Sequence, residues 1–257
     1  MNSKLKKVLV SSIALTTILG AGTGIASANS FAKENISSVQ QQEKKEMSKD
    51  DIKQLKMFFD EYGVEKQIQN SLILKLKKGI PWDSIKPESE IVSSEEIVSE
   101  TETQVIQKFK DGSISVQTLE TPAVQVEDNI STDNNESIFT PLSVTGGTVT
   151  TGTGYRTVRG AKVKVETGIC NAWFYADFTT LYGAMDRITS VYDSTVVGIG
   201  GTTNSDTLNI VRATETLDNK AEAKLNFQFV AFGGAGSSTV WLKLLVGKDT
   251  YSSDVNN

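Results

Sequence analysis

The stretch that decides the fold is KVKVETGICNAWFYADF, residues 162–178. Apolar and polar residues alternate on both sides of Thr167 and Gly168, where the two alternating runs meet. Alternation over four to eight residues is typical of a strand that buries one of its faces. The stretch therefore predicts two strands joined by a tight turn.

The same pattern continues through the rest of the chain beyond residue 143. Residues 220–230 and 239–246 alternate most cleanly, and glycine-rich breaks separate one run from the next. Seven or eight short strands at roughly regular spacing, each with one apolar face, are typical of antiparallel sandwiches and barrels. We therefore predict a mainly β protein, with an antiparallel β-sandwich (or barrel) over residues 143–257.

The segment 48–87 has a helical pattern instead. Ser48 followed by Asp51 is close to a capping box, and apolar residues recur at helical spacing after it. Gly63 and Gly79 can end two successive helices in a left-handed conformation. These features predict a helical hairpin, with Trp82 placed to cover its open end. So small a unit is either a docking module or a hairpin that needs a partner to pack against.

An acidic, serine-rich composition marks residues 88–142 as a flexible linker. Residues 88–136 contain twelve acidic side chains and only Lys108 and Lys110 as bases. Within this range, Asp111-Gly112 separates two alternating runs and predicts a β-hairpin at residues 103–119. A lone hairpin is marginally stable in water, so we expect it to pack on another element.

The N-terminus has the features of an export signal. Lys4, Lys6 and Lys7 precede an uncharged apolar run, and Ala26-Ser27-Ala28 supplies a small-residue cleavage pattern. We predict a signal peptide over residues 1–28, cleaved after Ala28, and a secreted, extracellular product. The alternative is a membrane anchor, which the Ser, Thr and Gly content disfavours. Residues 29–47 are polar and predict a flexible arm.

Composition excludes several kinds of chemistry. The chain has no histidine, so a Ser-His-Asp or Cys-His nucleophile is impossible and the commonest metal ligand is missing. Acidic residues number 31 and basic residues 26, with no basic patch to bind nucleic acid. Cys170 is the only cysteine and falls on an apolar face, which predicts burial. We assign no catalytic residue, no metal and no cofactor.

Three aromatic side chains are the candidate ligand-binding residues. If the apolar residues of 170–178 face the core, Trp173 and Tyr175 face outward, and Trp241 has the outward phase on its own strand. Exposed aromatic rings beside polar groups suit sugar rings or a protein partner. The alternative is that the hairpin at residues 103–119, or a loop, covers the face that carries these aromatic side chains.

These observations favour a secreted, non-enzymatic binding protein whose β-sandwich engages a cell-surface carbohydrate, such as a cell-wall polysaccharide, or a protein partner. The alternative is a membrane-acting, pore-forming toxin, because residues 145–153 resemble an amphipathic inserting strand. A third possibility is a carboxylate-dependent glycoside hydrolase that uses Asp177, Asp186 and Asp193.

Several short motifs also resemble an uncharacterised family of secreted Gram-positive bacterial proteins. In the helical segment these are FFDEYGV at 58–64 and GIPWDS at 79–84. In the β region they are FYADFT at 174–179, RITSVY at 187–192 and VGKD at 246–249. The resemblance implies secretion and a short helical segment followed by a β-sandwich-like domain. It carries over no catalytic residue.

Overall fold

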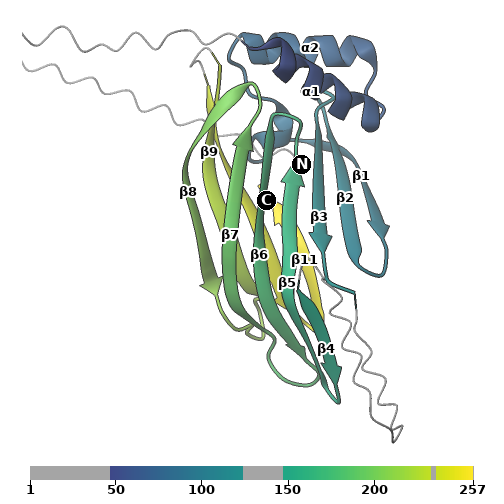
Figure 1. Cartoon of the computed structure of the whole chain (residues 1–257), viewed down its shortest axis with the longest axis vertical. Coiled ribbons are helices and arrows are strands. Elements are labelled where there is room, and N and C mark those ends of the chain that lie inside the picture. The colour runs from purple at the N-terminus through teal and green to yellow at the C-terminus, as the bar shows by residue number, and fades with distance from the viewer. Residues whose placement is uncertain (1–46, 124–146, 233–235, 257) are drawn as a thin grey trace, which may run out of the picture. The chain divides into compact units, whose positions relative to one another are not determined.

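Two antiparallel sheets pack face to face in the part of the chain that the structure describes (Figure 1). The structure is a computed structural model and describes residues 47–123, 147–232 and 236–256. Its helices are α1 (Lys49–Glu61), α2 (Lys66–Lys77) and the short 3-10 helix η1 (Asp83–Ile85). Its strands are β1 (Ile91–Val98), β2 (Glu102–Phe109), β3 (Ile114–Glu120), β4 (Thr148–Gly152), β5 (Tyr155–Glu166), β6 (Cys170–Leu181), β7 (Arg187–Gly198), β8 (Gly201–Arg212), β9 (Ala221–Ala231), β10 (Ser237–Gly247) and β11 (Thr250–Val255).

The predicted fold class is confirmed. One sheet has seven strands in the order β1-β2-β3-β5-β6-β7, with β4 paired to β5, and the other has four in the order β11-β10-β9-β8. Every strand pairing is antiparallel. The chain passes from one sheet to the other between β7 and β8. The described residues therefore form a two-sheet sandwich and not a closed barrel.

The alternating residues build the core between the sheets. Along β9 every second residue is buried, and β6 follows the same rule from Cys170 to Phe178. Phe174 and Phe178 of one sheet and Phe227 and Phe229 of the other are almost completely buried. Burying a side chain of this size contributes roughly 1.5–3 kcal/mol. The hydrophobic effect thus selects one face of each strand, as the pattern predicts.

Cys170 lies in this core. Its side chain is completely buried, and burial raises the pKa of its thiol far above the ordinary value. The prediction of a buried cysteine is confirmed. A thiol held in the protonated form in an apolar environment is a poor nucleophile.

The predicted helical hairpin is also confirmed. The Ser48 hydroxyl accepts from the Asp51 backbone N–H, and the Asp51 carboxylate accepts from the Ser48 N–H, both at 3.0 Å. Gly63 has φ +65° just beyond α1, as a left-handed helix end requires. Trp82 is fully buried, its Nε1 donates to the Leu72 carbonyl at 2.8 Å, and its ring lies 5.2 Å from that of Phe59.

The sequence leaves open whether this hairpin packs on the sandwich, and the structure shows that it does (Figure 1). Leu55, Phe59, Leu72 and Trp82 belong to the same continuous apolar core as the inner faces of both sheets. The described residues, 47–123, 147–232 and 236–256, accordingly belong to one compact unit.

Glycines in the turns between strands permit this close contact. A Cβ on Gly168, in the turn between β5 and β6, would lie 2.8 Å from the Phe58 ring. A Cβ on Gly200, between β7 and β8, would lie 2.5 Å from the Leu76 side chain. Both distances are too short for carbon atoms, so the absence of a side chain lets the helices approach the turns.

Part of the range expected to be acidic linker is strand instead. The hairpin predicted at residues 103–119 is present as β2 and β3, which flank Asp111-Gly112. However, β3 also pairs with β5, and β1 pairs with β2, so all three strands extend the large sheet. The strand β1 escapes prediction because all of its residues are exposed, and no buried face imposes an alternation.

Asp111 ties the β2–β3 turn to the helical segment. Its carboxylate accepts from Lys75 Nζ at 3.0 Å, from the Asp83 N–H at 3.1 Å and from the Ser113 hydroxyl at 2.6 Å. Burial raises the pKa of Asp111, but the hydrogen bonds from Ser113, Lys75 and Asp83 outweigh burial and hold that pKa below its ordinary value. The ionised form therefore stabilises the fold.

Some predicted segments lie outside the described residues. These are the signal peptide at 1–28, all but the last residue of the flexible arm at 29–47, and residues 124–146 of the linker and the start of the β region. Within the described ranges, no helix is both long and apolar enough to cross a bilayer.

Substituting Gly168 with Ala tests the contact between the helices and the sandwich. Gly168→Ala adds strain at φ +81° and a clash with Phe58, so we expect a loss of about 2–4 kcal/mol of unfolding free energy. Gly183→Ala is the matched control, because Gly183 has φ +76° with no atom within 4 Å of its Cβ position. It should cost only about 1–2 kcal/mol in urea unfolding. Equal losses of unfolding free energy in the two variants would contradict the close contact of Phe58 with Gly168.

Acid should weaken the Asp111 contacts. Because the folded pKa of Asp111 is depressed, its stabilisation is present above the unfolded value of about 3.9 and is lost as the pH falls through the folded value. Unfolding free energy of the native chain should therefore fall between about pH 5 and pH 2 more steeply than that of Asp111→Asn. Parallel pH profiles of the two proteins would show that Asp111 does not contribute.

Candidate functional site

A row of polar and aromatic side chains crosses the outer face of the seven-stranded sheet. Strand register pairs Glu120 of β3 with Lys162 of β5, Lys162 with Tyr175 of β6, and Tyr175 with Tyr192 of β7. Directly paired residues in an antiparallel sheet project to the same side. The four side chains therefore stand next to one another on the face that points away from the core.

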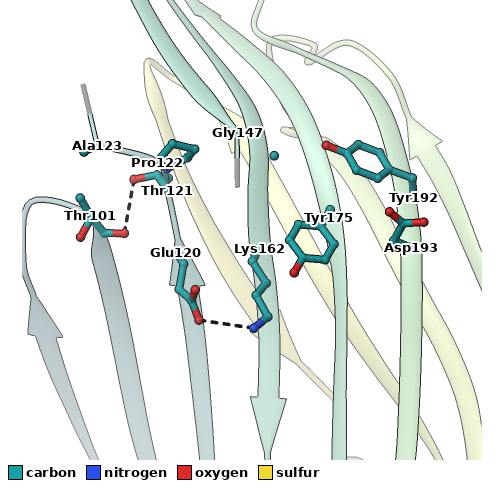
Figure 2. Close-up of a pocket in the computed structure, with 11 residues that line it drawn as sticks. Thr101, Glu120, Thr121, Pro122, Ala123, Gly147, Lys162, Tyr175, Tyr192 and Asp193 are labelled. Carbon is teal, nitrogen blue, oxygen red and sulfur yellow. Dashed lines mark hydrogen bonds and ion pairs between the residues drawn. The ribbon is translucent and has the colours of Figure 1, made fainter. Parts of the chain in front are cut away.

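This row lies in a groove. The groove has a volume of about 810 Å³ and is open to solvent, and Figure 2 shows how its walls come from separate strands and loops. Its lining residues are Thr101, Glu120, Thr121, Pro122, Ala123, Gly147, Gly160, Lys162, Tyr175, Tyr192 and Asp193. The chemistry is mixed, with two phenol rings, two carboxylates and one amine. We call this feature the outer-sheet groove.

The two tyrosine rings form one side of the outer-sheet groove (Figure 2). Their centroids are 6.0 Å apart and their planes differ by 14°, so the rings are nearly parallel. Tyr192 is 37% exposed, and Tyr175 is partly buried. Two aligned rings on neighbouring strands present a rigid apolar surface beside polar groups.

Asp177 fixes one of these rings although it does not line the groove. Its Oδ1 accepts from the Tyr192 hydroxyl at 3.1 Å and from the Gly160 N–H at 2.8 Å, and its Oδ2 accepts from the Ser190 hydroxyl at 2.8 Å. Burial and then the Asp177 charge raise the pKa of the Tyr192 phenol. The phenol thus stays neutral at physiological pH, with its orientation set by the carboxylate.

Lys162 brings a positive charge to the middle of the row. Its Nζ lies 3.9 Å from the Glu120 carboxylate and 5.7 Å from the Trp173 ring centroid. The ion pair is loose, and both side chains are partly exposed. Exposed pairs of this kind contribute about 0–1 kcal/mol to stability. Both charges are therefore available to a ligand at little cost to the fold.

Irregularities in the strands coincide with the groove. The β5–β6 register shifts between Val158 and Ala161, around Gly160 with φ +73°. The β6–β7 register shifts between Trp173 and Tyr175, and Asp193 has φ +51°. Bulges bend a strand and redirect its side chains, and they occur often beside functional sites. Here they lie within or next to the groove.

The structure separates the three predicted site residues. Trp173 and Tyr175 do project from the outer face of β6, but Trp241 lies on β10 in the four-stranded sheet. The outer faces of a sandwich look in opposite directions, so the expectation of one shared face is wrong. Trp241 instead lies near Lys224 and Lys243, at 5.7 and 6.0 Å from its ring centroid. Alternation predicts which side chains of a strand face the core, but it does not predict to which of the two sheets the strand belongs.

The three carboxylates considered for hydrolysis have separate environments. Asp177 accepts the three hydrogen bonds described above, and Asp193 lines the groove. Asp186 is completely buried, and its carboxylate accepts the N–H groups of Leu181 at 2.7 Å and Asp249 at 2.9 Å. Burial raises the pKa of Asp186. Among the described residues, no group of three or more Cys, Asp or Glu side chains is placed to hold a metal ion.

Reasoning from sequence missed Tyr192, Lys162 and Glu120. Lys162 has the outward phase on β5, so alternation alone could nominate it. Glu120, however, has the same phase as the buried Val116, and Tyr192 has the same phase as the buried Ile188. Their convergence with Tyr175 depends on strand order and on bulges that shift the register. Neither is visible in an alternating pattern, because a one-residue shift leaves the apolar composition unchanged.

No model of a known protein family and no curated protein sequence matches this chain. Among solved structures, the chain is similar to the crystal structure of a hypothetical protein from Listeria monocytogenes EGD-e, with a TM-score of 0.32 and 14% sequence identity. The similarity covers 63% of this chain and 92% of that protein. So distant a likeness carries no argument about function. A proposal about function therefore rests on the geometry of the groove.

Proposed function

We propose that the chain is a secreted, non-enzymatic binding protein whose outer-sheet groove holds a cell-surface carbohydrate. The observation that carries the proposal is the cross-strand row of Glu120, Lys162, Tyr175 and Tyr192 in an open groove of about 810 Å³. An open groove on a sheet face suits an elongated ligand, whereas a small metabolite is usually enclosed by its pocket.

The chemistry of the groove supports a sugar ligand. A sugar ring has an apolar face of C–H groups and an edge of hydroxyls. The tyrosine rings offer flat apolar surfaces to the first, and Glu120, Asp193 and Lys162 offer acceptors and a donor to the second. The Asp177 hydrogen bond holds the Tyr192 ring in place before binding, which lowers the entropy lost on association.

A protein partner is the runner-up ligand. Tyrosines contribute strongly to protein interfaces too, and the groove is large enough to receive a protruding loop. The mixture of aligned rings and scattered charges within one concave surface favours the carbohydrate. We assign no residue a catalytic role. Histidine is absent, and the Asp177 carboxylate already accepts hydrogen bonds from the Gly160 N–H and the Ser190 hydroxyl.

Export to the cell surface is part of the same proposal. The signal-peptide pattern of residues 1–28 and the motif resemblance to secreted Gram-positive bacterial proteins support it. The membrane-acting alternative draws no specific support from the described chain. Of residues 145–153, the strand β4 pairs with β5 in the sandwich, and Val149 is buried in the core.

Retention on insoluble cell-wall material and on common polysaccharides tests the proposal. The native protein, expressed from residue 29, should be retained. The double variant Tyr175→Ala/Tyr192→Ala should bind at least tenfold more weakly, because the two rings supply the aromatic contact area on one side of the groove. Trp241→Ala, on the opposite sheet, is the matched aromatic control and should bind like the native protein.

Circular dichroism and a urea titration should first show that both variants are folded. Equal retention of the native protein and the folded double variant would place the ligand elsewhere on the molecule. Absence of retention on every matrix would remove the carbohydrate and leave a protein partner.

A further inference from the structure

The strand β1 is the edge strand at one end of the seven-stranded sheet (Figure 1). Among the residues that the structure describes, its only strand partner is β2. All eight of its residues, Ile91–Val98, are exposed. An edge of this kind presents unpaired backbone donors and acceptors, and another extended chain can pair with them.

The hairpin geometry shows which backbone groups are available. The Ser99 N–H donates to the Glu102 carbonyl at 2.8 Å, which makes these residues the pair that closes the hairpin. Hydrogen-bonded and non-hydrogen-bonded pairs alternate along an antiparallel ladder. The N–H and C=O groups of Ser94, Glu96 and Val98 therefore point away from β2, toward the open edge.

The side chains of β1 have a distinct order along the strand. Apolar residues occupy both ends, and they are 37% to 69% exposed: Ile91, Val92, Ile97 and Val98. The centre is polar, and the consecutive residues Glu95 and Glu96 project to opposite faces of the strand. A segment that pairs with β1 would meet apolar side chains at both ends and two carboxylates in the middle.

Further acidic residues lie beyond both ends of the strand, whereas Lys108, paired with Ser93, is a base close to the centre. Glu90 precedes the strand, and Glu100 and Glu102 follow it in the hairpin turn and at the start of β2. Lys110 is engaged with Glu90 at 2.9 Å, and this hydrogen bond raises the pKa of the Lys110 ammonium. The edge consequently has an excess of negative charge, which attracts cationic side chains and repels acidic ones.

A second copy of the chain is a poor match for this edge. Two-fold antiparallel pairing of β1 with itself, in the register centred on Glu95, would place the Glu95 side chains of the two copies directly opposite each other. Like charges placed opposite one another destabilise a sheet. Both copies are also net negative, with a formal charge of −5 for the full chain.

We propose that β1 is a docking edge for an extended segment of a partner protein, with basic side chains at its centre and apolar side chains at its ends. The segment adds a strand to the sheet beside β1. Main-chain hydrogen bonds to Ser94, Glu96 and Val98 supply affinity, and the carboxylates select the basic sequence. No residue of β1 itself lines the outer-sheet groove, and the test does not depend on carbohydrate binding.

The probe is an end-blocked eight-residue peptide with valines at both ends and two lysines at its centre. Titration calorimetry should show that it binds at least tenfold more tightly than the same peptide with two glutamates in place of the lysines. Ser94→Pro removes one outward N–H without changing any charge, and proline is tolerated at such an edge position. This variant should lose at least tenfold in affinity, while Ser94→Ala should bind like the native protein.

A charge-reversed protein keeps the test decisive if Ser94→Pro fails to fold. Glu95→Lys/Glu96→Lys should prefer the glutamate peptide over the lysine peptide. Equal affinity for both peptides, or no binding of the lysine peptide at about 1 mM, would overturn the proposal. A dimer in analytical ultracentrifugation that Ser94→Pro abolishes would also overturn it, because a second copy would then occupy the edge.

Discussion

The packing of Trp82 at the junction of helices and sheets is the contact on which the rest of the structure depends. Its indole is buried among Phe59, the Leu72 carbonyl and the turn at Gly168. A helical hairpin of this size has too little core to be stable alone. By sharing the core of the sandwich, the helices gain stability and seal one end of the two sheets. The ion pair of Lys75 with Asp111 adds a polar link at the same junction.

Much of this fold is predictable because local signals agree with the tertiary packing. The capping box at Ser48, the glycine at 63 and the turn at Asp111-Gly112 each predict an element that the structure contains. The alternation around residues 162–178 correctly identifies the buried face of β6. By contrast, β1 has no buried face, so its conformation depends on pairing with β2, which composition does not reveal.

The candidate site is less predictable than the fold for a physical reason. Period-two alternation places Tyr175 and Trp241 on outer faces, but two outer faces exist and they point in opposite directions. The groove further depends on bulges near Gly160 and Trp173, which bring Lys162, Tyr175 and Tyr192 into one row. A bulge adds one residue to a strand and reverses the phase of the alternation beyond it, as between the buried Ile188 and the exposed Tyr192 of β7. Only the three-dimensional structure shows which side chains then meet.

Native-state hydrogen exchange tests most directly whether the helices and the sandwich form one cooperative core. If they do, the slowest amides of α2 should exchange through global unfolding, with the same opening free energy as the central amides of β6 and β9. Denaturant should lower that free energy equally in all three elements. Exchange of α2 at a much lower opening free energy, while β6 and β9 stay protected, would show that the helices open independently and would contradict the account.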